Sequence, residues 1–598
     1  MSKKIFERKD IKKEHKWDLE SIYDGLESWR KDFDKAIELG NKFQNHKGNF
    51  IKSPQALLQA LKDRDELYRL VSLVYAYAHM KLDEDTRNPQ SQDLSDRAMR
   101  LYVETNEKTA FLTPEILTIE DEKLGEYFET NKELRLYKHH MEDILRLKVH
   151  TLSPREEEIL AQAGEIGNSP SKIYSMFNNA DLTFPKVKNE DGEEVEITQG
   201  NFVPLLQSKN RDFRKEVFGK FYGVFEDFKN TLAASLSGEV SKNIFNSNVR
   251  NYESSRQASL SNNNIPLSVY DNLIEGIHNE FPSIYRYMDI RKKVLGVDQL
   301  HMYDIYVPMV SELDLEYSYE ECIEIITKAL EPLGEEYIEI MKEGFNSRWI
   351  DVFENRGKRS GAYSSGSYDS KPFILLNFHG TLDDLFTIAH EMGHSMHSYF
   401  TRENQPFVYG SYSIFLAEVA SMLNESLLLD YMIKNAKNDN EKKYLLNHYL
   451  ESFRTTMFRQ TMFAEFEQKI HETVEEGGAL TADFLKKSYK KLNELYYGQN
   501  TVMDDGIDME WGRIPHFYMN YYVFQYATGF AAAAALSKKI LEGEEGAVKR
   551  YINFLKSGRS DYPINTLKEA GVDMTTREPV ENCMEVFIDV LDEFENLI

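Results

Sequence analysis

Two histidines and a glutamate near the middle of the chain have the types and spacing that hold and use a metal ion. His390, Glu391 and His394 lie in the sequence HEMGH, which matches the pattern HExxH. Positions four apart on an α-helix share one face, so both imidazoles can bind one ion. The carboxylate of Glu391 can then reach a water on that ion. The pattern predicts one Zn²⁺ per chain and hydrolysis by a metal-activated water.

The third ligand is expected from a following helix. His397 lies about 10 Å along a helix axis from His390, whereas a zinc–nitrogen bond is about 2 Å long. We therefore interpret His397 as a surface residue or as one that supports a ligand. Glu418 is the better candidate, because residues 413–430 are apolar almost all round and predict a buried helix. A buried carboxylate must be paired or bind metal, and a buried salt bridge is the alternative for Glu418.

A further carboxylate, Glu425, lies seven residues after Glu418 and is expected on the same helix face. It could hydrogen-bond an imidazole that binds the metal and so orient that ring. The alternative is that Glu425 pairs with an unrelated group, since no feature of the sequence identifies its partner.

A helix from about residue 382 to about residue 399 is predicted to carry HEMGH. Thr381 and Asp384 form a capping pattern at its start, and apolar residues follow at helical spacing. Gly393 costs about 1 kcal/mol relative to alanine inside a helix. Close packing of a neighbouring helix and space for a metal site are two compatible explanations for it.

A polar loop and a short strand are predicted just before this helix. Residues 361–372 are rich in glycine, serine and tyrosine, and residues 373–378 read as a strand. An extended peptide could pair with free backbone groups of that strand. Gly361, Ala362 and Tyr363 are the candidate peptide-binding residues. An ordinary buried strand is the alternative, because exposure of a strand edge cannot be read from a sequence.

A second cluster of polar aromatic residues lies between residues 512 and 529. It contains His516, Tyr518, Tyr521, Tyr522 and Tyr526 within eleven residues. Their ring N–H and O–H groups could donate hydrogen bonds to a charged tetrahedral intermediate. Aromatic rings also fill protein cores, so composition alone leaves both explanations open.

Composition excludes several classes of protein. The formal net charge of −27 argues against binding to nucleic acid or to an anionic membrane. The chain has 2 cysteines, Cys322 and Cys583, which excludes a disulfide framework and suits a reducing compartment. No signal peptide is evident, and the longest apolar stretch near the end is too short to span a bilayer. We expect a cytoplasmic protein.

Helical periodicity dominates the chain and predicts a mainly α fold. The 598 residues exceed what one core usually holds, so more than one substructure is expected. Two alternating runs within residues 182–198 flank Asp191-Gly192, which is typical of a β-hairpin. We therefore predict a helical N-terminal region, 1–200, that ends in this hairpin, and a catalytic region, 201–598.

Taken together, these segments resemble oligoendopeptidase F, in the thimet oligopeptidase family of zinc metallopeptidases. The resemblance rests on residues 381–394, 415–425, 514–518, 525–529, 560–563 and 570–573. It implies a mainly α, two-lobed zincin-type fold with a small β element beside the active-site helix. It also implies a deep channel that admits short unfolded peptides and excludes folded proteins.

The same resemblance implies roles for individual residues. His390, His394 and Glu418 would bind zinc, and Glu391 would act in catalysis. His516 and a nearby tyrosine, Tyr526 before Tyr518, would stabilise the oxyanion.

Other functions stay open at this point. A peptidyl-dipeptidase on the same scaffold would need a cationic group for a terminal carboxylate, which the sequence does not place. A peptide-binding protein without activity is a second alternative, although the intact Glu391 argues against it. A purely structural zinc site is disfavoured, because such sites usually use four protein ligands rich in cysteine. Manganese or cobalt could replace zinc at a site of this kind.

Overall fold

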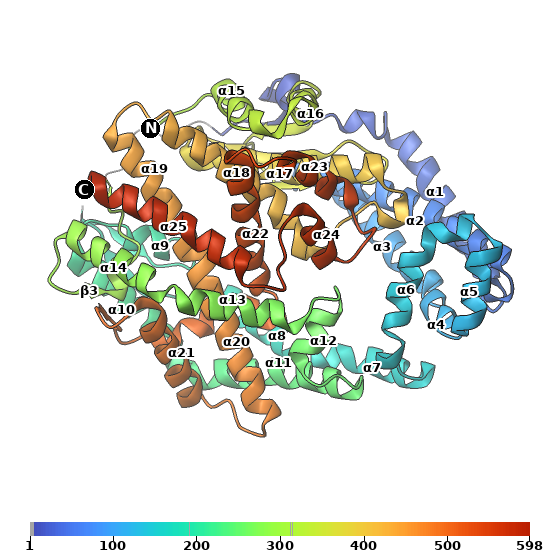
Figure 1. The fold of residues 1–598 in the computed structure, drawn as a ribbon, viewed down its shortest axis with the longest axis horizontal. Helices are drawn as coiled ribbons and strands as arrows, with labels where there is room; N and C mark the ends of the chain where they lie inside the picture. Colours follow the sequence, from blue (N-terminus) through green and yellow to red (C-terminus); the bar gives the residue numbers. More distant parts are fainter. Residues whose placement is uncertain (1–4, 191, 311–312, 314) are drawn as a thin grey trace. The chain divides into compact units, whose positions relative to one another are not determined.

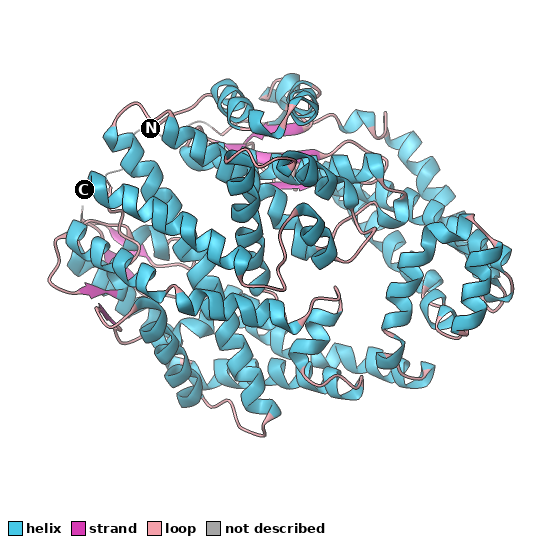
Figure 2. Ribbon diagram, in the orientation of Figure 1, coloured by secondary structure: helices cyan, strands magenta, loops and turns pink. Residues whose placement is uncertain are grey.

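The chain is described by a computed structural model that covers residues 5–190, 192–310, 313 and 315–598. These residues pack into two compact units, each built from three segments of the chain. The first unit is Met1–Val149, Leu315–Tyr431 and Leu536–Val572, and the second is His150–Asp314, Met432–Ala535 and Asp573–Ile598. Helices make up most of both units, which confirms the mainly α prediction (Figures 1 and 2).

The division into units differs from the boundary that we expected near residue 200. Each unit combines segments that are hundreds of residues apart in sequence. Turn-forming residues mark where the chain bends, but they do not reveal which distant helices share a core.

The helices of the first unit come from all three of its segments. They are α1 Leu26–Phe43, α2 Pro54–Asp83, α3 Pro89–Thr109, α4 Leu112–Ile116, α5 Asp121–Thr130, α6 Lys138–Arg146, α15 Tyr319–Ala329, α16 Glu335–Asn346, α17 Leu382–Asn404, α23 Ala547–Ser557 and α24 Pro563–Ala570. The long helix α2 begins at Ser53, whose side chain accepts a hydrogen bond from the N–H of Ala56, with Pro54 at its first position. Its apolar face packs against α1 and α3.

A three-stranded sheet in the first unit lies beside α17. Its strands are β4 Ile350–Phe353, β5 Tyr363–Ser365 and β6 Phe373–Phe378, in the order β4-β6-β5. The strand predicted at 373–378 is confirmed as β6. It pairs in parallel with β4 and antiparallel with β5, so both of its edges are occupied. Our expectation that a peptide could add to this strand was wrong, because a central strand has no free edge.

The second unit is also helical, with two small pairs of strands. Its helices are α7 Pro154–Gly167, α8 Ser169–Met176, α9 Phe202–Leu206, α10 Arg211–Asp227, α11 Lys229–Val249, α12 Ser255–Ser261, α13 Leu267–Asn279, α14 Phe281–Leu295, α19 Asp439–Ser452, α20 Arg459–Glu475, α21 Ala482–Tyr497 and α25 Glu578–Leu597. Two more helices, α18 Ile414–Lys434 and α22 Phe524–Leu541, have residues in both units.

The predicted hairpin is confirmed in the second unit. Strands β1 Lys186–Lys188 and β2 Glu194–Glu196 are antiparallel, with Val187 opposite Val195. Asp191 of the turn lies outside the described residues. The other pair, β3 Leu300–His301 and β7 Thr501–Val502, is parallel.

A buried ionic cluster joins α14 to α19 in the second unit. Glu451 pairs with Arg291 and Arg454, and it accepts a hydrogen bond from the hydroxyl of Tyr287. Burial by itself would raise the pKa of Glu451, but the two arginines outweigh burial and lower this pKa to about 2. The carboxylate therefore stays charged at neutral pH.

No helix in the described part of the chain combines the length and the apolarity that a bilayer crossing requires.

Candidate metal centre

Helix α17 begins where the capping pattern predicts. The hydroxyl of Thr381 accepts a hydrogen bond from the N–H of Asp384 at 3.1 Å, and Asp384 accepts one from the N–H of Thr381 at 2.9 Å. Each side chain thus satisfies a backbone group that the helix leaves unpaired. The helix then continues to Asn404, five residues beyond the predicted end.

Gly393 lets α18 approach the backbone of α17 closely. A Cβ atom at Gly393 would lie 2.6 Å from the Cα of Ser421 and 2.7 Å from the carbonyl oxygen of Ala420. One turn away, the buried Asn424 donates a hydrogen bond to the carbonyl oxygen of Ala389 at 3.0 Å. Packing of a neighbouring helix therefore explains this glycine, and it brings the first half of α18 alongside HEMGH.

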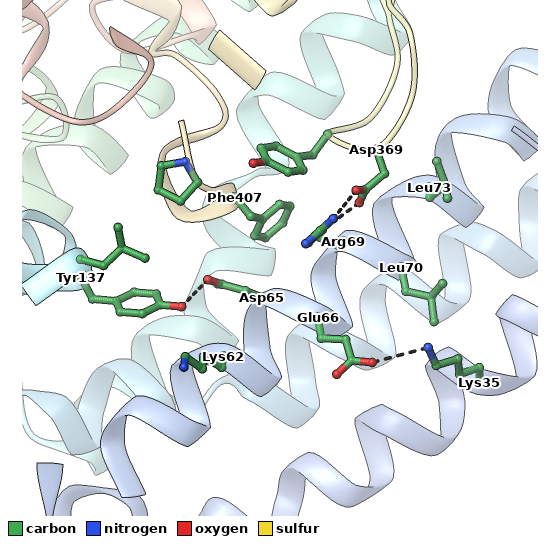
Figure 3. Close-up of a pocket in the computed structure, with 13 residues that line it drawn as sticks. Lys35, Lys62, Asp65, Glu66, Arg69, Leu70, Leu73, Tyr137, Asp369 and Phe407 are labelled. Atoms are coloured by element: carbon green, nitrogen blue, oxygen red, sulfur yellow. Dashed lines mark hydrogen bonds and ion pairs between the residues drawn. The ribbon is translucent and has the colours of Figure 1, made fainter. Parts of the chain in front are cut away.

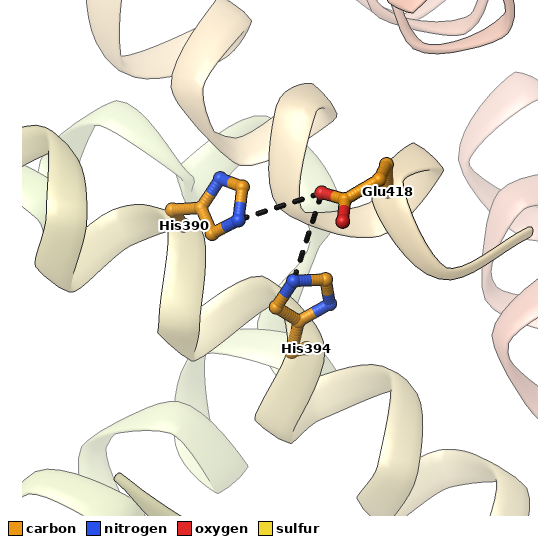
Figure 4. A group of neighbouring side chains, drawn as sticks. All are labelled: His390, His394 and Glu418. Carbon is orange, nitrogen blue, oxygen red and sulfur yellow. Dashed lines mark ion pairs between the residues drawn. The ribbon is translucent and has the colours of Figure 1, made fainter. Parts of the chain in front are cut away.

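His390, His394 and Glu418 meet between these two helices (Figure 4). Oε2 of Glu418 lies 3.5 Å from Nε2 of His390 and 3.7 Å from Nε2 of His394. One ligand atom from each residue lies within 4.8 Å of the other two. Two ligands of one tetrahedral zinc ion are about 3.3 Å apart. The spacing of the three residues therefore fits one metal ion of the size of zinc.

Both histidines have a second partner that orients the ring. Nδ1 of His390 donates a hydrogen bond to Oε1 of Glu425 at 2.5 Å. Burial opposes a charged ring, but Glu425 and the neighbouring carboxylates outweigh burial and raise the pKa of His390 to about 9. His394 hydrogen-bonds the backbone carbonyl of Ala417, while burial and the nearby His390 lower its pKa to about 4. A metal would bind Nε2 of His390 in place of its proton, while Nδ1 keeps its hydrogen bond to Glu425.

Glu391 is largely buried beside the three candidate ligands. Its side chain is 8% exposed, and burial raises its pKa to about 7, against the opposing effect of His390. The backbone of Ser364, in β5, hydrogen-bonds the Glu391 carboxylate, and the hydroxyls of Ser364 and Ser395 are 2.8 Å apart. Strand β5 therefore lies directly against the part of α17 that carries Glu391.

His397 is buried, so the part of our interpretation that placed it on the surface was wrong. Its ring is 0% exposed and stacks on Tyr412, with 3.7 Å between ring centroids. The hydroxyl of Tyr412 lies 3.0 Å from that of Ser398 and 3.4 Å from the carbonyl oxygen of His394. His397 and Tyr412 thus support the turn that carries His394, and sequence reasoning did not identify Tyr412.

The candidate peptide-binding residues lie at the start of β5. The backbone oxygen of Gly361 accepts a hydrogen bond from Asn377 at 2.8 Å, and Ala362 follows, partly exposed. The hydroxyl of Tyr363 donates to Asp83 at 2.7 Å, so this side chain is tied to α2. Their backbone, not the Tyr363 ring, is the part that could meet a peptide.

Three polar rings of the second unit gather at the start of α22. The ring centroid of His516 lies 6.1 Å from that of Tyr522 and 5.8 Å from that of Tyr526, and the two tyrosines are 5.4 Å apart. Tyr518 instead stacks on Tyr174, at 4.3 Å. Both tyrosines lie in the tyrosine-rich segment, which is the only feature of the sequence that points to Tyr522. The fold shows that Tyr522, and not Tyr518, lies beside His516 and Tyr526.

A separate hollow of about 530 Å³ lies in the first unit, between α2 and the loops that contain Asp369 and Phe407 (Figure 3). Its charged side chains all have partners, some within the lining and some, such as Glu133 for Lys62, outside it. Arg69 donates to Asp369 at 3.0 Å, and the hydroxyl of Tyr137 donates to Asp65 at 2.8 Å. These pairs leave the hollow without the convergent free polar groups that mark a ligand site.

Comparison with known proteins identifies the family of the chain. The family model described as Peptidase family M3 matches residues 204–586, and that described as Oligopeptidase F matches residues 115–184. The Oligopeptidase PepF of Bacillus subtilis is 49% identical over 99% of this chain and 88% of its own.

Two crystal structures extend the likeness to the fold. Oligoendopeptidase-F from Enterococcus faecium is 40% identical, with a TM-score of 0.75, over 96% of this chain and 99% of its own. A crystal structure from Chlamydophila abortus is 36% identical, with a TM-score of 0.93, over 100% of both chains. The chain therefore belongs to peptidase family M3, within its oligoendopeptidase F group, and is a peptidase.

Proposed function

We propose that the chain is a zinc-dependent endopeptidase that hydrolyses short unfolded oligopeptides. The observation that carries this proposal is the convergence of His390, His394 and Glu418 within 4.8 Å, with the buried Glu391 beside them. Two imidazoles, one carboxylate and an adjacent glutamate are the donor set and the proton carrier that water activation by zinc needs.

The reaction needs a proton to move from water to the leaving amine. When bound, Zn²⁺ lowers the pKa of a water to about 7 and polarises a carbonyl group. Glu391 accepts the proton of the attacking water and later delivers it to the leaving nitrogen, so the carboxylate is regenerated. Glu425 holds the His390 ring with its Nδ1 protonated, which leaves Nε2 free to bind metal.

We assign stabilisation of the oxyanion to His516 and Tyr526, as the family resemblance implies. The ring cluster described above adds Tyr522 as a third donor. A role for Tyr518 in stabilising the oxyanion, ranked after that of Tyr526, remains a prediction. Its ring stacks on Tyr174, which favours a packing role over hydrogen bonding to a substrate.

The outer edge of β5 is the proposed binding place for an extended peptide. The backbone of Gly361, Ala362 and Tyr363 leads into this strand, and Ser364 contacts Glu391. A peptide paired along the edge would pass the catalytic carboxylate in an extended form, which selects unfolded substrates. We also propose that the protein acts in the cytoplasm, in keeping with its two unpaired, buried cysteines.

A capped-peptide digest tests the proposal. Peptides of increasing length, blocked at both ends, are incubated with the zinc-loaded enzyme, and the products are read by mass spectrometry. We expect internal cleavage that a chelator abolishes and added zinc restores. Cleavage only of peptides with a free carboxyl end would show a peptidyl-dipeptidase, and binding of zinc and peptide without cleavage would show a peptide-binding protein.

A further inference from the structure

We propose that Glu467, on α20, is a positioning residue that holds the backbone before Tyr522 and thereby sets the rings of Tyr522 and Tyr526. The inference rests on the proposed function, in which these rings and His516 assist the reaction. Its effect would pass through the backbone of Tyr521, whose N–H donates a hydrogen bond to Glu467.

The backbone that precedes Tyr522 is strained. Asn520 and Tyr521 have φ angles of +32° and +56°. Residues with a side chain rarely adopt this left-handed region, and here two of them do so in succession. Such a conformation persists only where surrounding contacts enforce it.

Glu467 supplies the contact that enforces this turn. Its Oε1 accepts a hydrogen bond from the backbone N–H of Tyr521 at 2.5 Å. Glu467 is 0% exposed and Tyr521 is 2% exposed, so this bond is shielded from bulk solvent. A second bond, from the hydroxyl of Ser259 to the carbonyl oxygen of Asn520 at 2.8 Å, holds the other strained residue.

The ring of Tyr521 anchors the same turn in the core. Its centroid lies 4.8 Å from that of His471 and 5.6 Å from that of Tyr270. His471 is one turn after Glu467 on α20, and its Nδ1 lies 2.8 Å from the backbone oxygen of Glu467. With Tyr521 turned inward, the partly exposed Tyr522 faces away from this core and meets His516 and Tyr526.

Glu467 is a poor choice for packing alone, which favours a positioning role. Its Oε2 is buried and has no hydrogen-bond partner among the described residues. Burying a carboxyl with one oxygen unpaired is costly, so an apolar side chain would pack better. Burial raises the pKa of Glu467 to about 8, so the group is a neutral acid at neutral pH. Glutamine therefore reproduces its charge, its size and the acceptor oxygen.

The test compares two variants of similar volume. Glu467→Met removes the acceptor but fills the space, whereas Glu467→Gln keeps the acceptor. We expect Glu467→Met to lower kcat roughly ten- to a hundredfold with little change in KM, since small misplacements of catalytic groups cost rates of this order. The kcat of Glu467→Gln should stay within about threefold of that of the parent. Glu472→Met is the control, because Glu472 is on the same helix, is partly exposed and contacts Gln468.

Two further measurements separate positioning from stability. Zinc content and melting temperature are recorded for each variant, and kcat is expressed per folded, zinc-loaded enzyme. Both changes act through one ring cluster, so their effects on kcat should not add. In the Tyr526→Phe variant, Glu467→Met should lower the logarithm of kcat by less than about a third of the decrease that it causes in the parent.

Three outcomes would overturn the inference. The first is an unchanged kcat in Glu467→Met. The second is an equal loss of kcat in Glu467→Met and Glu467→Gln. The third is that the decreases in the logarithm of kcat caused by Glu467→Met and Tyr526→Phe add in full in the double variant. If Tyr526→Phe and His516→Ala instead leave kcat intact, the assigned role of the rings fails. The inference about Glu467 then fails with it, whereas an isolated failure of Glu467 leaves the proposed function standing.

Discussion

Replacing Gly393 by alanine should disrupt the metal centre although none of the three ligand residues is changed. The added Cβ would lie 2.6 Å from the Cα of Ser421 in α18 and 2.7 Å from the carbonyl oxygen of Ala420. Carbon atoms in ordinary contact are about 3.5 to 4.0 Å apart. The two helices would therefore have to separate by about 1 Å at this point.

Two opposing effects decide the sign of the stability change. Alanine favours a helix interior over glycine by about 1 kcal/mol, whereas overpacking costs about 1 to 3 kcal/mol. The contacts of Gly393 are backbone atoms that cannot rotate away, so we expect overpacking to prevail.

In Gly393→Ala, the affinity for zinc should change more than the free energy of unfolding. A shift of about 1 Å between α17 and α18 would move Glu418 relative to His390 and His394, and metal sites tolerate roughly 0.2 Å. We expect zinc to bind about 10- to 100-fold more weakly, the range seen when support of a ligand is lost.

The assay is competition for zinc with a chromophoric chelator, together with the melting temperature of the metal-free protein. Gly223→Ala on α10 is the matched control. Gly223 is exposed, and a Cβ there would meet no atom within 4 Å. This control should keep zinc affinity and gain up to about 1 kcal/mol. If Gly393→Ala bound zinc as tightly as the parent, the close approach of α18 would not position Glu418.

Three further predictions concern single carboxylates. Glu391→Gln should retain zinc and lose most turnover, and a near-parental kcat would exclude Glu391 from the reaction. Glu425→Gln should weaken zinc binding about 10- to 100-fold, and unchanged affinity would show that Glu425 does not orient His390. Because the pKa of Glu451 is about 2 in the folded chain and 4.5 is its ordinary value, its stabilisation is complete above pH 4.5. It should be lost as the pH falls towards 2, by about 3 kcal/mol in all. Unfolding by denaturant at pH 5 and at pH 2.5 should therefore show a smaller loss for Glu451→Gln than for the parent.

Local patterns in the sequence predicted the two helices that carry the candidate metal ligands. The spacing of His390 and His394, the cap at Thr381 and the apolar helix around Glu418 each depend on residues a few positions apart. Helix and hairpin geometry repeat over such distances in every protein, so these features could be derived without a fold. Gly393 also marked the helix contact, although either of its two explanations was possible from sequence alone.

Contacts between distant segments were decided only by the tertiary structure. The sequence showed a strand at 373–378, but not that β4 and β5 occupy both of its edges, because strand pairing joins residues far apart in the chain. It did not show that His397 is buried against Tyr412, or that Tyr522 and not Tyr518 joins His516 and Tyr526. Burial and the direction of a side chain depend on what packs from elsewhere, and no local period encodes that information.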